Sequence, residues 1–382
     1  MEKIILVPDS FKGTMSSNEV CDIMHQAILR HFSDAKVVSI PVADGGEGSV
    51  DCFLAALGGE KVEVMVKGPY SEDMLSFYGR LPDGTAVIEM AACAGLPLVE
   101  GRKAAEKTTT YGVGLLIKAA VKDGCRKIIV GLGGSATNDG GTGMAAALGV
   151  KFFDGNGRDF IPVGETLHLI QRINVDSRIP ELKGVDIVTM CDIDNPLCGL
   201  NGAAHIFGPQ KGATPEIVEM LDNGLLHLAA IISRDLGKDV LTLPGAGAAG
   251  GMGGGMVAFL DSKLQMGIET VLDITGFDEH LKGADLVLSG EGKLDRQSLR
   301  GKVVIGVARR TQKLDVPLVA IVGDIGDDIE EAYNLGVSAI FSINRMAIPF
   351  SESRIRSKDD LRLTVDNLIR WYKTTRRCDS KH

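Results

Sequence analysis

The first sixty residues alternate short apolar runs with segments of helical periodicity, and this alternation restricts the fold more than any other feature of the chain. Residues 3–7 and 36–42 are apolar runs typical of buried strands, whereas residues 16–32 and 50–57 have the spacing of helices. A polar loop follows each apolar run. This β-α-β-α order predicts parallel strands flanked by helices, with ligands bound at the carboxyl ends of the strands.

The same alternation returns near the C-terminus, where apolar runs at 284–288, 317–322 and 338–342 alternate with helical segments at 303–313, 330–335 and 359–372. Five parallel strands are the count of a flavodoxin-like sheet. From residue 61 the pattern changes: residues 62–66 alternate between apolar and polar, and the runs at 75–81 and 85–89, joined by a turn at 82–84, predict two antiparallel strands. We therefore expect two α/β domains, a discontinuous flavodoxin-like, Rossmann-type domain of residues 1–60 and 280–382 and an inserted mixed α/β domain of residues 61–279.

Charge and composition narrow the classes of partner. The formal net charge is -9, so the chain lacks the basic surface that neutralises nucleic-acid phosphates. Its seven cysteines are scattered and form no Cys-x-x-Cys pair, which is typical of reduced thiols, and no run of about 18 apolar residues predicts a membrane span. We expect a cytoplasmic protein that binds small molecules rather than nucleic acid or membrane.

A glycine-rich loop at residues 131–143 follows the apolar run 127–130 and leads into a short helical segment at 144–148. Glycines allow a ligand to approach the backbone closely, and backbone N–H groups before a helix favour an anion. Phosphate is the ligand that this pattern predicts. The alternative is a tight turn between two packed elements without any ligand.

Polar side chains gather where the predicted strands end. The first two loops carry Asp9, Ser10, Lys12, Asp44 and Glu47, and further acids follow later strands, namely Asp139, Asp192, Glu291 and Asp295. Phosphoryl transfer requires donors around the phosphates, a bridging metal, and a carboxylate that orients the attacking hydroxyl. The loops contain all three kinds of group, and Lys12, Lys293 or Lys302 would add positive charge.

Two other classes of protein fit parts of the sequence. Gly131-x-Gly133-x-x-Ala136 with Asp154 downstream, and the letters of residues 245–250, match the dinucleotide fingerprint of an NAD(P)-dependent oxidoreductase. A ligand-binding protein without turnover is the third class, although anionic ligands alone would not require so many carboxylates. No Walker-type motif is present, so a kinase of that type is excluded.

Taken together, the loops resemble those of the bacterial glycerate kinase family. The matching motifs extend over nearly the whole chain in order: Pro8-Asp9-Ser10-Phe11-Lys12-Gly13, Ala43-Asp44-Gly45-Gly46-Glu47-Gly48, Gly131 to Gly141, Asp192 to Gly199, and Ser289-Gly290-Glu291-Gly292-Lys293-Leu294-Asp295. The resemblance implies transfer of the γ-phosphoryl group of ATP to a hydroxyl of D-glycerate, giving 2-phosphoglycerate, with Mg²⁺ as cofactor.

The resemblance also implies roles for individual residues. Asp192 is the expected metal ligand, with Glu291 or Asp295 as its partner, and Asp44 or Glu47 would orient the glycerate hydroxyl. Lys12 would offset charge on the transferring group. The remaining expected substrate or nucleotide contacts are Asp9, Ser10, Gly45, Gly46, Gly133, Gly134, Ser135, Asn138, Asp139 and Lys293.

Overall fold

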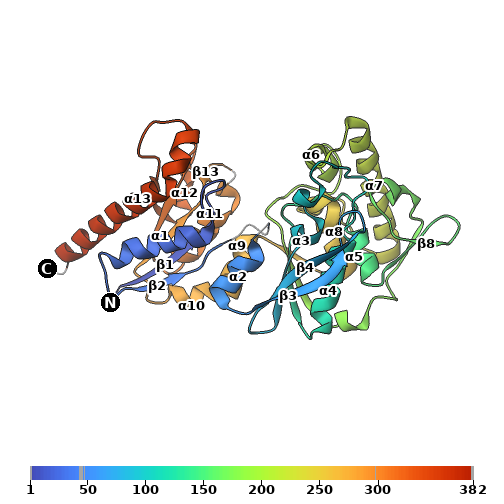
Figure 1. The fold of residues 1–382 in the computed structure, drawn as a ribbon, viewed down its shortest axis with the longest axis horizontal. Helices are drawn as coiled ribbons and strands as arrows, with labels where there is room; N and C mark the ends of the chain where they lie inside the picture. The colour runs from blue at the N-terminus through green and yellow to red at the C-terminus, as the bar shows by residue number, and fades with distance from the viewer. Residues whose placement is uncertain (1, 43–45, 47, 297, 380–382) are drawn as a thin grey trace. The chain divides into compact units, whose positions relative to one another are not determined.

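The computed structural model describes residues 2–42, 46, 48–296 and 298–379, and the chain folds into two compact units (Figure 1). The discontinuous unit comprises residues 1–43 and 268–382, and the inserted unit comprises residues 44–267. The sequence-based division had placed the breaks at 60/61 and 279/280. Helix α2 (Ser49–Leu57) falls in the inserted unit because it packs on strands β4 and β5 of that unit.

Five parallel strands form the sheet of the discontinuous unit: β1 (Lys3–Pro8), β2 (Lys36–Ser39), β12 (Leu286–Gly290), β14 (Leu318–Val322) and β16 (Val337–Ser342). Their order across the sheet is β16-β14-β12-β1-β2, with every pair parallel. Counted along the chain, this is the order 2-1-3-4-5 of flavodoxin-like folds. The predicted fold class is confirmed.

Helices cover both faces of this sheet. The longest of them, α1 (Ser17–Leu29) and α13 (Phe350–Asp379), pack against each other and share a core with Ile4, Leu6 and Leu288 on one face. Side chains of the same strands that point to the opposite face of the sheet are also buried. Helix α11 (Val303–Gln312) contacts β1, β12 and β14. The remaining helices of this unit are α9 (Gly267–Ile274), α10 (Phe277–Leu281) and α12 (Glu331–Asn334).

Two helix ends show how local chemistry sets the boundaries. Ser16 caps α1, since its hydroxyl accepts from the Glu19 amide while the Glu19 carboxylate accepts from the Ser16 amide. Helix α13 is longer than the predicted 359–372. Its C-terminal turns are held to the sheet because Arg376 forms ion pairs with Glu2 and Asp285, which directly precede β1 and β12.

The inserted unit contains a six-stranded mixed sheet of order β11-β10-β6-β5-β4-β3. Strands β5 (Thr85–Glu89), β6 (Lys127–Gly131), β10 (Asp186–Met190) and β11 (Lys263–Gln265) are parallel, and β3 (Glu60–Lys67) and β4 (Asp73–Arg80) add antiparallel pairs. Strands β7 (Lys151–Phe153), β8 (Asp159–Phe160) and β9 (Arg172–Asn174) form a separate small sheet.

Seven α-helices pack around these sheets among the described residues: α2, α3 (Ala91–Ala94), α4 (Tyr111–Lys122), α5 (Thr142–Ala147), α6 (Ala203–Phe207), α7 (Pro215–Leu236) and α8 (Ala248–Leu260). One continuous apolar core joins β5, β6, α4, α7 and α8. In the part of the chain that the structure describes, none of the helices is long and apolar enough to cross a membrane.

Candidate active site

Asp9 and Glu291 occupy equivalent places at one edge of the discontinuous unit. Strands β1 and β12 are paired with Pro8 opposite Gly290, and the Asp9 amide donates to the Gly290 carbonyl at 2.8 Å. Each carboxylate therefore follows directly on its strand. Both side chains are nearly buried, with 9% of Asp9 and 5% of Glu291 exposed. Two acids in this position create a locally negative, poorly solvated edge.

The environment of Glu291 disfavours its charge. Burial raises the pKa of this carboxyl to about 7, an effect opposed by its hydrogen bond with Ser298 and reinforced by the nearby charge of Asp9. Its Oε1 atom is buried and has no hydrogen-bond partner among the described residues. A buried carboxylate oxygen without a donor is costly, so this atom is available to a cation or to a protonated ligand.

The other predicted residues of this unit lie around the same edge. Ser10 donates its amide to Asp9 Oδ1 at 2.6 Å, and Lys12 is exposed on the loop that follows. Lys293 is also exposed, on the short strand β13 (Lys293–Leu294). Asp295 is half-buried, and its Oδ1 accepts from the Ser298 amide at 3.3 Å. The structure thus brings Asp9, Ser10, Glu291 and Asp295 to one sheet edge.

In the inserted unit, the glycine-rich loop joins β6 to α5. Gly134 is exposed and has a left-handed backbone with φ of 72°, a conformation that favours glycine. The adjoining Ser135 forms an isolated bridge with Gly95, in which the Leu96 amide donates to the Gly134 carbonyl and the Ala136 amide to the Ala94 carbonyl. The outer end of the loop, at Gly133 and Gly134, therefore reaches the surface, while its inner end is buried.

Asp139, at the inner end of this loop, is fully buried and bonded on both oxygens. Its Oδ2 accepts from the amide and hydroxyl of Thr110, each at 2.8 Å, and from the Gly143 amide at 3.2 Å. Its Oδ1 accepts from the Gly141 amide at 3.0 Å. These bonds join the start of α4 to the start of α5. Asp139 therefore has a structural position, although the sequence suggested a contact with substrate or nucleotide.

Asp192 follows the end of β10 in the inserted unit. Its Oδ1 accepts from the amide of Gly267, the first residue of α9, at 2.7 Å, and the side chain is half-buried. A carboxylate at a helix N-terminus is favourable because it satisfies an amide that has no partner within the helix. The adjacent Cys191 is not an activated nucleophile, since burial raises the pKa of its thiol to about 11.

Lys211 is a residue of this region that sequence reasoning missed. It ends a 3₁₀ turn (Pro209–Lys211), is 2% exposed, and donates to Ser135 Oγ at 2.9 Å and to the Thr137 carbonyl at 2.7 Å. Lysine in a short turn is ordinarily a surface residue. The only sequence signal is that glycines at 208 and 212 bracket it, and this signal is weak.

Several expected contacts fall outside the described residues, namely Asp44, Gly45 and Glu47. The adjoining Gly46 is described, and its carbonyl accepts from the Ser49 hydroxyl at 2.7 Å. Glu89 was not predicted as a functional residue. Its buried carboxylate accepts from the amides of Gly48 and Val50, so it caps the start of α2.

Comparisons with known proteins identify the group to which this arrangement belongs. The glycerate kinase family model matches residues 4–373. This chain belongs to the glycerate kinase family. It is 42% identical to a glycerate kinase of Bacillus cereus over 97% of the chain and 98% of the relative. It is also 45% identical to a glycerate 2-kinase of Escherichia coli over 89% of the chain and 90% of the relative.

A solved structure agrees with this assignment. A crystal structure of a candidate glycerate kinase 2 from Salmonella typhimurium LT2 superimposes with a TM-score of 0.88 at 39% identity, covering 98% of this chain and 99% of the other. The resemblance stated from the motifs is thus confirmed. As a member of the glycerate kinase family, the chain is a kinase enzyme.

Family membership leaves no support for the oxidoreductase alternative, and the structure shows why its motifs misled. Strand β7, which precedes Asp154, pairs antiparallel with β8 and β9 in a separate small sheet, and the later strand that pairs in parallel with β6 is β10. Asp154 lies in an exposed turn, where its Oδ1 accepts from the Asn156 and Arg158 amides. It is a turn residue rather than a ribose-binding acid.

The second glycine-rich segment is packed against the first. A Cβ atom on Gly250 would lie 2.0 Å from the Thr137 carbonyl oxygen, and one on Gly255 would lie 2.3 Å from that of Gly140. Residues 249–251 have left-handed backbone inside α8, and the Gly140 amide donates to the Gly250 carbonyl. These glycines permit contact between two backbones, so their match to a dinucleotide fingerprint has no functional meaning here.

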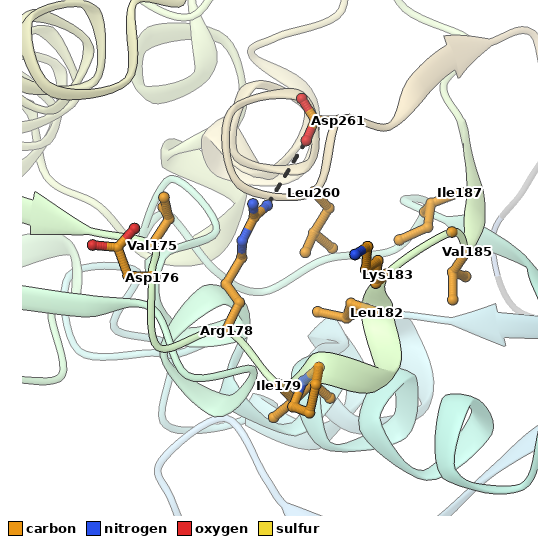
Figure 2. A pocket seen from close by; sticks show the side chains of 12 residues that line it. Val175, Asp176, Arg178, Ile179, Leu182, Lys183, Val185, Ile187, Leu260 and Asp261 are labelled. Carbon is orange, nitrogen blue, oxygen red and sulfur yellow. Dashed lines mark ion pairs between the residues drawn. The ribbon is translucent and has the colours of Figure 1, made fainter.

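A pocket of about 490 Å³ also lies in the inserted unit, between residues 175–187 and the C-terminal end of α8 (Figure 2). Arg178 crosses it toward Asp261, with 3.8 Å between Nη1 and Oδ2. Val185 and Ile187 line it at the beginning of β10, whereas Asp192 follows the end of that strand. None of the predicted site residues lines this pocket.

The described residues contain no preformed group of three or more histidine, cysteine, aspartate or glutamate side chains that could hold a metal ion. A Mg²⁺ site need not have one, because Mg²⁺ usually takes one or two protein carboxylates and fills its other positions with water and substrate oxygens. The paired acids Asp9 and Glu291, with an unpartnered buried oxygen on the latter, fit this requirement.

Proposed function

We propose that this kinase transfers the γ-phosphoryl group of ATP to a hydroxyl of D-glycerate and releases 2-phosphoglycerate. The observation that carries the proposal is the buried, unpartnered Glu291 oxygen beside Asp9 at the carboxyl ends of two parallel strands. Such an edge attracts a metal-bound polyanion. The naming of the Escherichia coli relative as a glycerate 2-kinase supports attack by O2 of the substrate.

The proposal assigns a task to each group of residues. Mg²⁺ held by Glu291, Asp295 or Asp192 would neutralise charge on the phosphates of the nucleotide. Backbone amides at Gly133 and Gly134, with the Ser135 hydroxyl, would bind phosphate oxygens, and Lys12 and Lys293 would add positive charge. Asp44 or Glu47, which lie outside the described residues, would orient the glycerate hydroxyl and accept its proton.

The direct test is a coupled assay of ADP formation with D-glycerate, ATP and MgCl₂. We expect turnover that requires all three, and a phosphorus NMR spectrum of the product that corresponds to 2-phosphoglycerate. A product phosphorylated on O3 would contradict the proposed regiochemistry alone. No turnover with D-glycerate, in a sample whose circular dichroism shows a folded protein, would contradict the proposed reaction.

Glu291→Gln is expected to stabilise the protein at pH 8 in the presence of EDTA. The folded carboxyl has a pKa of about 7 against an ordinary value of 4.5, so between these values the folded chain holds a proton that the unfolded chain has released. Stability therefore falls as the pH rises through this window, by up to about 3 kcal/mol once Glu291 is fully ionised. Glutamine lacks this penalty.

Urea titrations at pH 4.5 and pH 8 measure this difference, with Glu279→Gln, a substitution in an exposed ion pair with Lys282, as the matched control. We expect wild type and Glu291→Gln to converge at pH 4.5 and to separate at pH 8, with MgCl₂ raising the stability of wild type only. The same pH dependence in both proteins would contradict the assigned environment of Glu291. Equal stabilisation of both by MgCl₂ would remove Glu291 as a metal ligand.

A further inference from the structure

Lys211 is a buried cation whose partners do not match its charge. Its ammonium group has three N–H donors and gives two of them to the Ser135 hydroxyl and the Thr137 carbonyl, both neutral acceptors. Burial lowers the pKa of Lys211 to about 7, and the charge of Asp139 opposes this effect. An anion next to the ammonium group would keep it protonated, because it would replace the solvation that burial removes.

The glycine-rich loop that Lys211 contacts contains three side-chain atoms without hydrogen-bond partners among the described residues. Thr137 Oγ1 and both Asn138 amide atoms, Oδ1 and Nδ2, are buried and have no hydrogen-bond partner among the described residues, and both side chains are 0% exposed. Leaving a buried polar atom unpaired is costly, because it loses its hydrogen bonds to water without gaining others. Three such atoms in consecutive residues beside a buried lysine are therefore unfavourable unless another molecule pairs with them.

A fourth unpaired atom lies on a neighbouring segment. Glu106 Oε2 is buried without a partner, and the backbones of Glu106 and Asn138 both adjoin Gly164, where an added Cβ would lie 3.1 Å from Glu106 Cα and 3.2 Å from the Asn138 carbonyl oxygen. The unpaired set thus contains donors and acceptors in one part of the inserted unit.

The mixture of donors and acceptors indicates what the occupant is. Phosphate offers acceptors almost exclusively, so it would satisfy Lys211 and Asn138 Nδ2 but leave Asn138 Oδ1 and Glu106 Oε2 unpaired. A small hydroxy acid offers carboxylate oxygens to the donors and hydroxyl protons to the acceptors. Because these side chains are almost completely buried, a small ligand is favoured over a bulky one there, whereas Gly134 at the outer end of the loop is exposed.

We propose that Lys211, Thr137 and Asn138 form the subsite that binds the carboxylate and a hydroxyl of the hydroxy-acid substrate. This inference rests on the proposed function and adds the element that selects an acid over an uncharged polyol. Lys211 pairs with the carboxylate, and Asn138 and Thr137 hydrogen-bond the hydroxyl next to it. Glycerol, which has the hydroxyls of glycerate but no carboxylate, should gain nothing from Lys211.

The test compares Lys211→Met with wild type and with Lys103→Met, a control at an exposed lysine near the same turn. We expect Lys211→Met to raise KM for D-glycerate about 10- to 100-fold, the range that loss of a buried charge-assisted hydrogen bond produces. KM for ATP should change less than twofold. The preference for D-glycerate over glycerol, as a ratio of kcat/KM values, should shrink by a similar factor.

Stability separates this role from a structural one. If Lys211 only holds the loop together, Lys211→Met should lower Tm and raise both KM values, and that result would overturn the inference. If Lys211 instead serves to bind the substrate carboxylate, its charge has no hydrogen-bonded anion in the substrate-free protein. Replacing it by an apolar side chain of similar shape should then leave the Tm of the substrate-free protein unchanged or higher. D-glycerate should then raise the Tm of wild type but not that of Lys211→Met.

Thr137→Val provides a second, nearly isosteric variant in case Lys211→Met does not fold. It removes one hydroxyl and should raise KM for D-glycerate about 3- to 10-fold without changing KM for ATP. Unchanged KM and specificity ratio in a wild type that phosphorylates D-glycerate would overturn the subsite and leave the proposed function standing. A wild type that makes no ADP with D-glycerate would overturn the function itself.

Discussion

Asp192→Asn is expected to lower kcat by about 10²- to 10³-fold while changing the free energy of unfolding by less than about 1 kcal/mol. The large effect on kcat follows from the proposed role of Asp192 as a metal ligand, since metal-based charge stabilisation is worth several kcal/mol in the transition state. The small effect on stability follows from the observed bond. Asparagine Oδ1 can still accept from the Gly267 amide as Asp192 Oδ1 does at 2.7 Å.

Steady-state kinetics at several Mg²⁺ concentrations, together with urea titrations, measure both quantities. Asp186→Asn is a suitable control, because Asp186 begins the same strand and its exposed side chain forms a 3.6 Å ion pair with Lys263. It should be active within about twofold, as is usual for exposed pairs. A fully active Asp192→Asn enzyme with an unchanged Mg²⁺ requirement would eliminate Asp192 as a ligand and leave it as a helix cap.

Asp139→Asn should destabilise the inserted unit by about 3–5 kcal/mol. The carboxylate is fully buried and accepts four hydrogen bonds. In asparagine one oxygen is replaced by an NH₂ group, which is itself a donor and cannot accept from the protein groups around it. Losing one acceptor costs about 1–3 kcal/mol, and burying an unpaired donor costs about the same. Both costs are larger where one of the groups is charged. For a unit of this size, Tm should fall by roughly 10 °C.

Thermal unfolding followed by circular dichroism, with Asp159→Asn as the control, tests this prediction. Asp159 is exposed and pairs with Lys151 at 3.4 Å, so its substitution should change Tm by no more than about 1–2 °C. A variant of Asp139 with native Tm and a selectively raised KM for ATP or D-glycerate would restore Asp139 to the set of binding residues.

The fold was largely predictable because its signals are local. Apolar runs such as Lys3–Pro8 and Leu318–Val322 are typical of buried parallel strands, and five such runs predicted a flavodoxin-like sheet, which the structure shows with the order 2-1-3-4-5. The acids at strand ends were predictable for the same reason, since parallel strands place Asp9 and Glu291 at one edge.

What could not be predicted depends on contacts between distant residues. Lys211 lies 76 positions after Ser135, and nothing in the sequence near either residue indicates that they touch. The sequence also offers no means of separating Asp139, whose oxygens are saturated by protein donors, from Glu291, which has an oxygen without one. Both are acids after glycine-rich or buried segments, and only the surroundings of each carboxylate reveal the difference.

The contact between Gly250 and the Thr137 carbonyl has a consequence for how the loop at 131–143 acquires its shape. The loop is continuous in the sequence, but the conformation of its inner half depends on contacts with a backbone segment more than a hundred residues downstream. A peptide cut to span 127–148 would therefore not hold this conformation, and grafting the motif into another scaffold would fail without its distant counterpart. Because this contact joins residues more than a hundred positions apart, we expect the turn to form late in folding.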